Sequence, residues 1–202
     1  MAKSIAEAKQ AVHEMLVNKR FGSSGETIVI EQFLEGDEFS VLAFSDGKQI
    51  RLLPTAQDHK RAYFKDQGPN TGGMGCISPF VLLSEQKLEE VKRTIMQATI
   101  DCLAKEGCPF VGVLFAGLML TLENQVKVLE FNCRFGDPET QTVLPLLKSD
   151  LFNIFLSCTK NSSKCASPLS DSVPSLAEVP VEFTEKNVVS YVIASGGYPD
   201  TS

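Results

Sequence analysis

Two oxygen-bearing side chains, Glu130 and Asn132, lie two residues apart in a stretch with strand-like alternation. The alternation predicts a β-strand on which Val126, Val128, Glu130 and Asn132 project from one face and residues 127, 129, 131 and 133 from the other. Residues two apart on a strand are separated by about 7 Å. A carboxylate and an amide oxygen so placed can share Mg²⁺, which commonly takes one or two protein oxygens together with water and phosphates. The exposed face of an edge strand explains the same residues, so this stretch alone leaves both interpretations open.

The residues that follow this strand favour the metal interpretation. Arg134 supplies a positive charge and Gly136 a flexible turn. Asp137, Pro138 and Glu139 then have the form of a helix start, with an acidic N-cap and proline at the first helical position. The sequence therefore predicts a cation, a turn and a helix N-terminus beside the two ligands.

A second group of residues, suited to binding anions, lies in residues 57–75. Lys60 and Arg61 carry positive charge there, and residues 68–75 contain four glycines. Glycines let the backbone approach a ligand closely and turn several amides towards an anion. The region has no hydrophobic periodicity, which predicts a long loop. A solvated surface loop fits these residues equally well, because they lack the Gly-Lys-Ser/Thr ending of a Walker loop.

A strand that breaks at a glycine indicates where a nucleotide could bind. The β-branched run at residues 26–34 predicts a central strand, which Gly36 interrupts before a second strand resumes over residues 38–44. Such a break leaves main-chain groups free to read the edge of an adenine. Glu38, four residues beyond Leu34, would be within reach of a ribose. A simple hairpin with surface acids is the alternative.

Other patterns predict the elements that must position these residues. The expected elements are a helix from Ser4 to about Arg20, a hairpin turn at 45–48, an extended segment at 49–54, a long amphipathic helix from Ser84 to Gly107, a buried strand at 110–121 that forms an antiparallel hairpin with the strand of Glu130, a short helix capped by Ser149 and a last strand at 188–193.

The composition is that of an ordinary globular protein of 202 residues, with one domain or one and a fraction. The net charge of −6 argues against general nucleic-acid binding. No apolar run is long enough to cross a membrane, and no signal peptide opens the chain, so the expected compartment is the cytosol. The six cysteines include no Cys-x-x-Cys pair, which predicts reduced thiols.

Five motifs follow one another along the chain, at residues 31–38, 57–61, 68–75, 116–120 and 129–139. Together they resemble phosphoribosylamine-glycine ligase, also called glycinamide ribonucleotide synthetase, in its eukaryotic form. The resemblance runs from residue 2 to about residue 199, and five motifs in family order are far more specific than any one alone. It implies an α+β fold of the ATP-grasp type, with mainly antiparallel sheets and flanking helices, present incompletely.

The resemblance also implies an ATP-dependent carbon-nitrogen ligase of de novo purine biosynthesis. ATP would phosphorylate the carboxylate of glycine, and the amine of 5-phosphoribosylamine would attack the resulting glycyl phosphate. The products would be glycinamide ribonucleotide, ADP and phosphate. Catalysis would consist chiefly of aligning the reactants and neutralising their negative charge.

The site residues implied by the resemblance fall into four groups. Glu130 and Asn132 match the family's metal ligands for Mg²⁺, with Mn²⁺ as the alternative ion. The groups expected to bind ATP are the main chain of Glu31, Gln32, Phe33 and Leu34 around the adenine, and Glu38 on the ribose. The candidate catalytic residues are Lys60, Arg134 and Asp137. The residues expected to hold phosphates and the substrate amine are Asp58, His59, Lys60, Arg61, Pro69, Asn70, Thr71, Gly72, Gly73, Arg134, Gly136 and Asp137.

Two departures from the family pattern qualify these expectations. Many ATP-grasp proteins carry a further acid on the strand before the Glu-x-Asn strand, but residues 111–120 contain none, so a second protein-anchored ion is not expected. Family members also begin before Met1. The expectation is a chain truncated at both ends, which lacks the phosphate-covering glycine loop and its lysine and is inactive or weakly active by itself.

The expected domains are a partial ATP-grasp domain at 1–160, a linker or irregular crossing at 161–187 and the start of a C-terminal domain at 188–202. The expected partners are small-molecule substrates, without nucleic acid or membrane, in a chain that belongs to a multifunctional purine-synthesis polypeptide. Two alternatives stay open: a non-catalytic nucleotide-binding fragment or splice product of that enzyme, and another ATP-grasp carboxylate-amine ligase.

Overall fold

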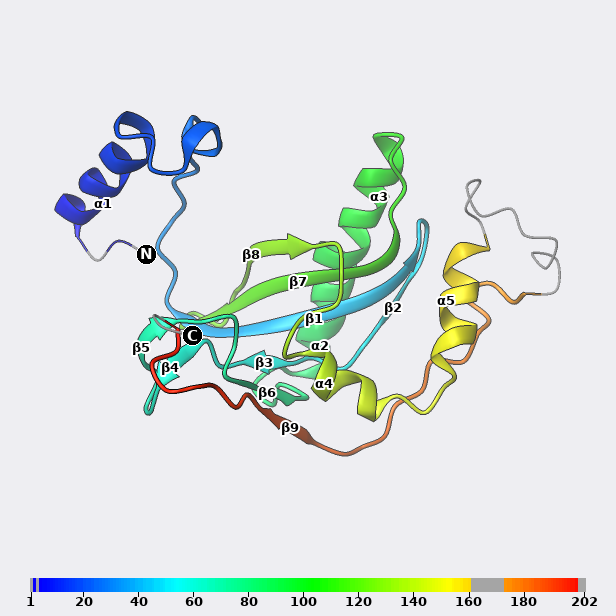
Figure 1. Cartoon of the computed structure of the whole chain (residues 1–202). Coiled ribbons are helices and arrows are strands. Elements are labelled where there is room, and N and C mark those ends of the chain that lie inside the picture. The colour runs from blue at the N-terminus through cyan, green and yellow to red at the C-terminus, as the bar shows by residue number, and fades with distance from the viewer. Residues whose placement is uncertain (1, 3, 161–172, 200–202) are drawn as a thin grey trace. The chain divides into compact units, whose positions relative to one another are not determined.

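The structure, a computed structural model, describes residues 2, 4–160 and 173–199. It divides the chain into two compact units, Met1–Glu35 and Gly36–Ser202. Each unit is described by itself (Figure 1). The predicted domain boundaries at 160 and 187 stay predictions, and residues 161–172 of the predicted linker lie outside the described residues.

The first unit is a short helical segment followed by an extended chain. Helix α1 (Ile5–Val12) continues into the π-helical turn η1 (His13–Val17), and a short 3₁₀ helix η2 (Gly22–Gly25) follows. The predicted cap at Ser4 is confirmed, because its Oγ accepts a hydrogen bond from the backbone N–H of Glu7 at 3.2 Å.

The strand predicted at residues 26–34 is wrong, since this segment is irregular in the structure. Val29 and Ile30 are 82% and 80% exposed. β-Branched residues favour a strand only where a neighbouring strand and a buried face receive them. The described part of this unit offers no strand for them to pair with.

The second unit contains all the described strands and six described helical segments. Its elements are β1 (Gly36–Asp46), β2 (Ile50–Leu52), β3 (Gln57–Asp58), β4 (Arg61–Tyr63), β5 (Gln67–Asn70), β6 (Gly75–Ser78), α2 (Glu85–Val91), η3 (Lys92–Gln97), α3 (Ala98–Lys105), β7 (Val111–Thr121), β8 (Val126–Asn132), α4 (Thr140–Val143), η4 (Leu144–Leu146), α5 (Leu151–Thr159) and β9 (Val188–Tyr191).

A four-stranded antiparallel sheet in the order β2-β1-β7-β8 forms the centre of this unit. Gly36, predicted to interrupt a strand, instead begins β1 by pairing with Thr121. The long pairing of β1 with β7 and the predicted hairpin of β7 with β8 are both present. β8 lies at the edge of this sheet, where it pairs with β7 on one side.

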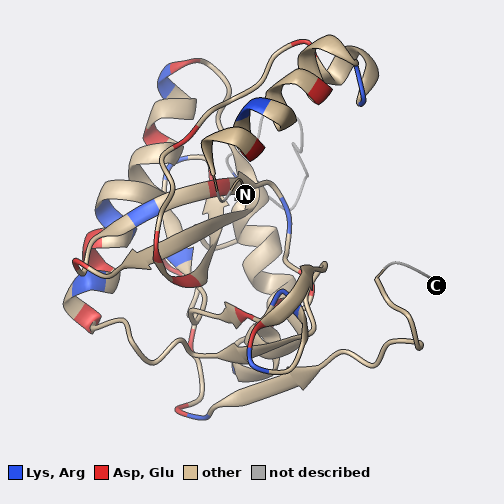
Figure 2. Ribbon diagram, turned by 90° about the vertical axis from the view of Figure 1, so that its left-hand side faces the viewer, with Lys and Arg blue, Asp and Glu red and all other residues tan. Residues whose placement is uncertain are grey.

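One face of this sheet packs against a long helix, as Figure 1 shows. Helix α2, the π-helical turn η3 and helix α3 run without a break from Glu85 to Lys105. Ser84 caps the helix through the backbone N–H of Lys87, as predicted. Its inward residues Val91, Met96 and Ile100 are buried against sheet residues such as Leu118. Figure 2 shows both signs of charge distributed along this helix, which is typical of a solvated outer face.

The opposite face of the sheet packs against α4, α5 and part of the chain after residue 173. Phe44 and Phe115 of the sheet meet Ile154 of α5 and Leu176 in one buried cluster. Helix α5 begins differently from the prediction, because Asp150 caps it through the backbone N–H of Asn153. Ser149, the predicted cap, instead accepts a hydrogen bond from the backbone N–H of Glu182.

Two small sheets lie in the region predicted as one long loop, so that prediction is wrong in part. β6 pairs with β3 and with β9, and β4 pairs with β5 in a two-stranded ribbon. These strands are two to four residues long, too short to produce hydrophobic periodicity. Main-chain pairing with neighbours distant in sequence orders the region instead.

The cysteines within the described residues, Cys76, Cys102, Cys108, Cys133 and Cys158, are free thiols, as predicted. Cys165 lies outside the described residues. Among the described helices, none is both long enough and apolar enough to span a membrane.

Candidate functional site

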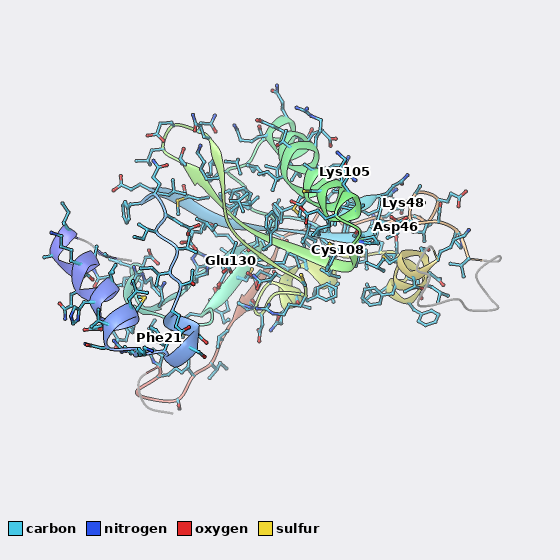
Figure 3. The ribbon with its side chains drawn as sticks, turned by 90° about the horizontal axis from the view of Figure 1, so that it is seen from above. Phe21, Asp46, Lys48, Lys105, Cys108 and Glu130 are labelled. Atoms are coloured by element: carbon cyan, nitrogen blue, oxygen red, sulfur yellow. The ribbon has the colours of Figure 1, made fainter. Side chains whose placement is uncertain are left out.

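A cavity of about 220 Å³ lies in the second unit, on the sheet face opposite the long helix. Strands β1, β7 and β8 form its floor, and Asp58, Lys60 and the turn after β8 supply its walls. In Figure 3, Glu130 lies along the sheet well away from the β1–β2 hairpin marked by Asp46 and Lys48. The predicted metal ligands and several predicted substrate-binding residues therefore share one site.

An irregularity in β8 places Glu130 and Asn132 in this cavity. Gly117 pairs with Glu130, but the next residue of β7, Leu118, pairs with Val128. Leu129 is therefore one extra residue in β8, the arrangement of a β-bulge. Bulges redirect side chains and are frequent beside functional sites.

The bulge shows that the predicted alternation of this strand is wrong. Val126 and Val128 lie opposite residues of β7 that face the long helix, whereas Glu130 and Asn132 lie opposite residues that face the cavity. The two halves of the strand thus present their even-numbered residues to opposite faces. The sequence alone does not reveal the bulge, because residues 126–132 fit an alternating pattern that continues without interruption through Leu129.

Glu130 and Asn132 are nevertheless side by side, as predicted. Asn132 Nδ2 donates a hydrogen bond to Glu130 Oε1 at 3.2 Å. Gly117 makes room for the carboxylate, because a Cβ at that position would lie 3.2 Å from Glu130 Cγ. One carboxylate and one amide oxygen that line a cavity fit the donor set that Mg²⁺ takes beside phosphates. Within the described residues, no group of three or more His, Cys, Asp or Glu side chains could hold a metal, so a larger protein ligand cage is absent there.

Lys60 and Glu38, predicted to contact phosphates and the ribose separately, form an ion pair in the cavity wall. Lys60 Nζ lies 3.1 Å from Glu38 Oε2. Burial acts to lower the pKa of Lys60, but Glu38, Asp58 and Glu130 outweigh it and raise that pKa above its ordinary value. Lys60 is therefore held charged and within the site.

Asp58 lines the cavity with an ionisation strongly changed by its surroundings. Burial, and then the negative charges of Glu139 and Glu38, raise the pKa of Asp58 from 3.8 to about 7, against the opposing effect of Lys60. Its Oδ1 is buried and has no hydrogen-bond partner. A Cβ on Gly73, whose φ is +130°, would lie 2.6 Å from that oxygen, so only glycine fits beside it.

Among the charged residues that line the cavity, Glu139 is the one that was not predicted as a site residue. It is only 4% exposed, and its Oε1 accepts a hydrogen bond from Ser40 Oγ at 3.1 Å. The sequence assigned it to a helix start, which is wrong in its position: α4 begins at Thr140 and Asp137 does not cap it. Asp137 Oδ1 accepts instead from Gln141 Nε2 at 2.6 Å. The sequence position of Glu139, directly after Asp137 and Pro138, gave no sign of burial, because that burial depends on β1, which is distant in sequence.

The remaining predicted residues divide between the cavity and its surroundings. Gly72, Arg134, Gly136 and Asp137 line the cavity. The predicted substrate-binding residues that do not line it are His59, Arg61, Pro69, Asn70, Thr71 and Gly73. Several of these shape the β4–β5 ribbon instead: Arg61 Nη1 donates to the Gly68 carbonyl, and Thr71 Oγ1 donates to the carbonyl of Lys60.

The residues predicted to read adenine lie in the other unit. Glu31, Gln32, Phe33 and Leu34 belong to Met1–Glu35, whereas Glu38 belongs to Gly36–Ser202. Phe33 is 58% exposed within its irregular segment. The assignment of these four residues to adenine stays a prediction.

Comparison with known proteins identifies relatives of the whole chain. It is 47% identical over 201 residues to the trifunctional purine biosynthetic protein adenosine-3 of Gallus gallus. This match covers 100% of this chain and 19% of that protein. It is 48% identical over 197 residues to the bifunctional purine biosynthetic protein ADE1 of Schizosaccharomyces pombe. That match covers 98% of this chain and 23% of the relative. The chain thus spans about a fifth of the length of these relatives.

Solved structures share the fold. The crystal structure of phosphoribosylamine-glycine ligase from Thermotoga maritima matches 98% of this chain and 46% of its own, with a TM-score of 0.73 and 30% identity. The biotin carboxylase domain of the Hydrogenobacter thermophilus 2-oxoglutarate carboxylase, solved with MgADP and bicarbonate, matches 91% of this chain and 36% of its own at a TM-score of 0.62. Its 11% identity shows the fold alone.

A family model covers most of the chain directly. The model described as phosphoribosylglycinamide synthetase, ATP-grasp (A) domain, matches residues 1–140, which contain both ligands of the proposed metal pair and every motif up to the turn after β8. The α+β architecture and the ATP-grasp fold predicted from the sequence are thereby confirmed. The chain belongs to the phosphoribosylglycinamide synthetase ATP-grasp family.

Proposed function

We propose that this chain supplies the metal- and phosphate-binding site of an ATP-dependent phosphoribosylamine-glycine ligase. The reaction joins glycine to 5-phosphoribosylamine through a glycyl phosphate and gives glycinamide ribonucleotide, ADP and phosphate. The observation that carries the proposal is the adjacency of Glu130 and Asn132, which share one cavity with Lys60 and Arg134. Family membership and the names of the relatives support the choice of substrates.

The central task of such a site is to bring two negative groups together. The carboxylate of glycine and the γ-phosphate of ATP repel each other, so cationic side chains must lie between them. Lys60 and Arg134 line the cavity from different elements and can contact separate oxygens. Glu130 and Asn132 would hold Mg²⁺, with Mn²⁺ as the alternative. When bound, the ion neutralises charge on the phosphate oxygens.

The ion pair of Glu38 with Lys60 is compatible with a nucleotide in the same place. A carboxylate has two oxygens and about four acceptor positions. Glu38 Oε2 holds Lys60, which leaves Oε1 to accept hydrogen bonds from ribose hydroxyls. Glu38 would thus orient both the sugar and the lysine that contacts the phosphates. Main-chain groups of residues 31–34 remain our candidates for the adenine.

The wider setting is proposed on the same basis. The names of the relatives, trifunctional and bifunctional purine biosynthetic proteins, support a place in a longer multifunctional polypeptide. De novo purine synthesis supports the cytosol as the compartment. The proposed boundaries are an ATP-grasp part at 1–160 and a following domain from 188.

Calorimetric titration of the full-length protein with ATP, in the presence and absence of Mg²⁺, tests the metal pair. We expect Glu130→Ala to weaken Mg²⁺-dependent ATP binding about tenfold or more, because removal of one of two protein ligands leaves only the amide. Glu123→Gln is the matched control, since Glu123 is an exposed acid in the turn before β8. Equal Mg²⁺-dependent affinity in Glu130→Ala and the unchanged protein would contradict the proposed metal site.

Release of ADP by the full-length protein tests the reaction. We expect release that requires both glycine and 5-phosphoribosylamine and that falls at least about a hundredfold in Glu130→Ala, as for loss of a group that stabilises transferring phosphate. ADP release that is indifferent to glycine would refute the proposed activity.

A further inference from the structure

The outer edge of strand β2 is open. β2 lies at the other edge of the central sheet from β8, and the described residues contain no strand that pairs with its outer side (Figure 1). On its inner side, the backbone N–H of Leu53 donates to the carbonyl of Leu42 at 2.9 Å. Hydrogen-bonded and non-hydrogen-bonded pairs alternate along an antiparallel ladder. The main-chain N–H and C=O groups of Ile50 and Leu52 therefore point away from β1.

A groove of about 610 Å³ lies along this open edge. Residues 49–52 line it from the strand, and Ala177 lines it from the chain that follows α5. The long helix contributes Glu85, Leu88, Glu89 and Lys92. None of these residues lines the cavity of Glu130 and Asn132, so the groove is a separate site.

The alternation of β2 gives the groove two chemically different sides. Ile50 and Leu52 pack in the cluster that faces the long helix, and Leu88 of that helix packs against the same cluster. Arg51 faces the opposite way, where its Nη1 donates to the carbonyl of Ala177 at 3.5 Å. No carboxylate of the described chain lies within 4.0 Å of this guanidinium. One side of the groove thus offers apolar contact, and the other offers a positive charge.

We propose that this groove binds an extended segment of another protein, which adds to the sheet as a fifth strand and carries an acidic residue between two apolar ones. The inference does not depend on the proposed function. Strand addition of this kind gains affinity from main-chain hydrogen bonds and specificity from alternate side chains.

The geometry of β2 sets the order of side chains in the bound segment. In antiparallel pairing, the residues opposite Ile50 and Leu52 would exchange main-chain hydrogen bonds with them and direct their side chains to the side of Leu88. The residue between them would lie opposite Arg51 and on the same face, with the two Cβ atoms about 5 Å apart. A glutamate or aspartate at that place would supply the carboxylate that Arg51 lacks.

A second copy of this chain fits the groove less well. Two-fold symmetry would pair β2 with β2 of the other copy. The register that uses both open residues, Ile50 and Leu52, then places Arg51 of one copy opposite Arg51 of the other. Like charges directly opposite each other destabilise a strand pair. The arginine therefore favours a different partner, with an acid at this position.

Fluorescence anisotropy of a labelled peptide, Thr-Val-Glu-Val-Thr, titrated with the full-length protein, tests the inference. We expect saturable binding that weakens about tenfold or more when lysine replaces the glutamate, as for loss of a charge-assisted hydrogen bond. Methylation of both valine amides should abolish binding, because these N–H groups would donate to β2. Arg51→Glu should reverse the preference and bind the lysine peptide about tenfold or more tightly than the glutamate peptide, which also verifies that this variant is folded.

A variant of the helix tests the apolar side of the groove. Leu88→Ser should weaken binding of the glutamate peptide about tenfold, through loss of apolar contact with the two valines. Arg93→Ala is the matched control, because Arg93 is exposed on the same helix and does not line the groove. Its affinity for the peptide should stay within about twofold of that of the unchanged protein.

Four results would overturn the inference. The first is an absence of saturable binding by the glutamate peptide. The second is equal affinity of the unchanged protein for the glutamate and lysine peptides. The third is binding that survives methylation of both valine amides, which would mean adhesion without strand pairing. The fourth is a dimer of the unchanged protein, seen by analytical ultracentrifugation, that Leu88→Ser dissociates, which would make a second copy the occupant.

Discussion

At the scale of single residues, Asp58 shows how the cavity changes ordinary chemistry. Its carboxyl is partly removed from water and lies near other acids, so its pKa rises from 3.8 to about 7. Folding therefore makes Asp58 bind a proton more tightly than the unfolded chain does. Its contribution to stability is fully present below about pH 4 and is lost as pH rises through about 7.

Asp58→Asn should remove this dependence, because an amide does not ionise. We expect the free energy of unfolding of the variant, relative to the unchanged protein, to increase by about 1–2 kcal/mol between pH 4.5 and pH 8, a value reduced for solvent screening of a partly exposed group. Urea unfolding at several pH values measures it. A difference that stays constant across this range would show that Asp58 titrates normally.

The sequence predicted some site residues well and others not at all. Glu130 and Asn132 were predicted because residues two apart on a strand remain neighbours whatever the rest of the chain does. Glu139 was missed because its burial arises from contact with Ser40, ninety-nine residues earlier. A local sequence pattern shows which residues are neighbours on one strand, but it does not show contacts between residues distant in sequence.

At the scale of elements, the long helix from Glu85 to Lys105 stabilises the sheet that carries the site. The sequence predicted its beginning and its end correctly, since its cap and its terminal glycine both agree. Gly107, with φ of +77°, ends it as expected. The strand predicted at residues 26–34 failed for the opposite reason, because β-branched composition says nothing about whether a partner strand exists.

Ile100 tests the contribution of this helix. It is fully buried between the helix and the sheet, so Ile100→Ala should lower the free energy of unfolding by about 2–5 kcal/mol through lost apolar contact and the cavity left behind. Chemical denaturation provides the measurement. Arg93→Ala, at an exposed position of the same helix, should change stability by less than about 0.5 kcal/mol. A similar small loss in both variants would mean that the helix does not pack as described.

At the scale of the whole molecule, the chain consists of two units that differ in how many of their side chains are buried. Both buried hydrophobic clusters consist entirely of residues after Gly36, and so do the residues that line the cavity. The first unit has no fully buried side chain in α1 or η1. The second unit therefore contains what a domain needs to fold independently.

Residues 36–202 produced by themselves should fold. We expect a cooperative thermal transition within about 5 °C of that of the intact chain, because the cores of the second unit are unchanged. Circular dichroism of the two proteins, side by side, provides the comparison. Loss of the cooperative transition in the shorter protein would show that the first 35 residues are required for the fold.

The extra residue at Leu129 separates two kinds of selective pressure along one strand. On its N-terminal side, Val126 and Val128 lie opposite β7 residues that face the long helix. On its C-terminal side, Glu130 and Asn132 line the cavity. Substitutions that change the thermal stability of the protein can accumulate on the first side without rotating the cavity side chains on the second. In this edge strand, robustness and chemistry can therefore evolve independently.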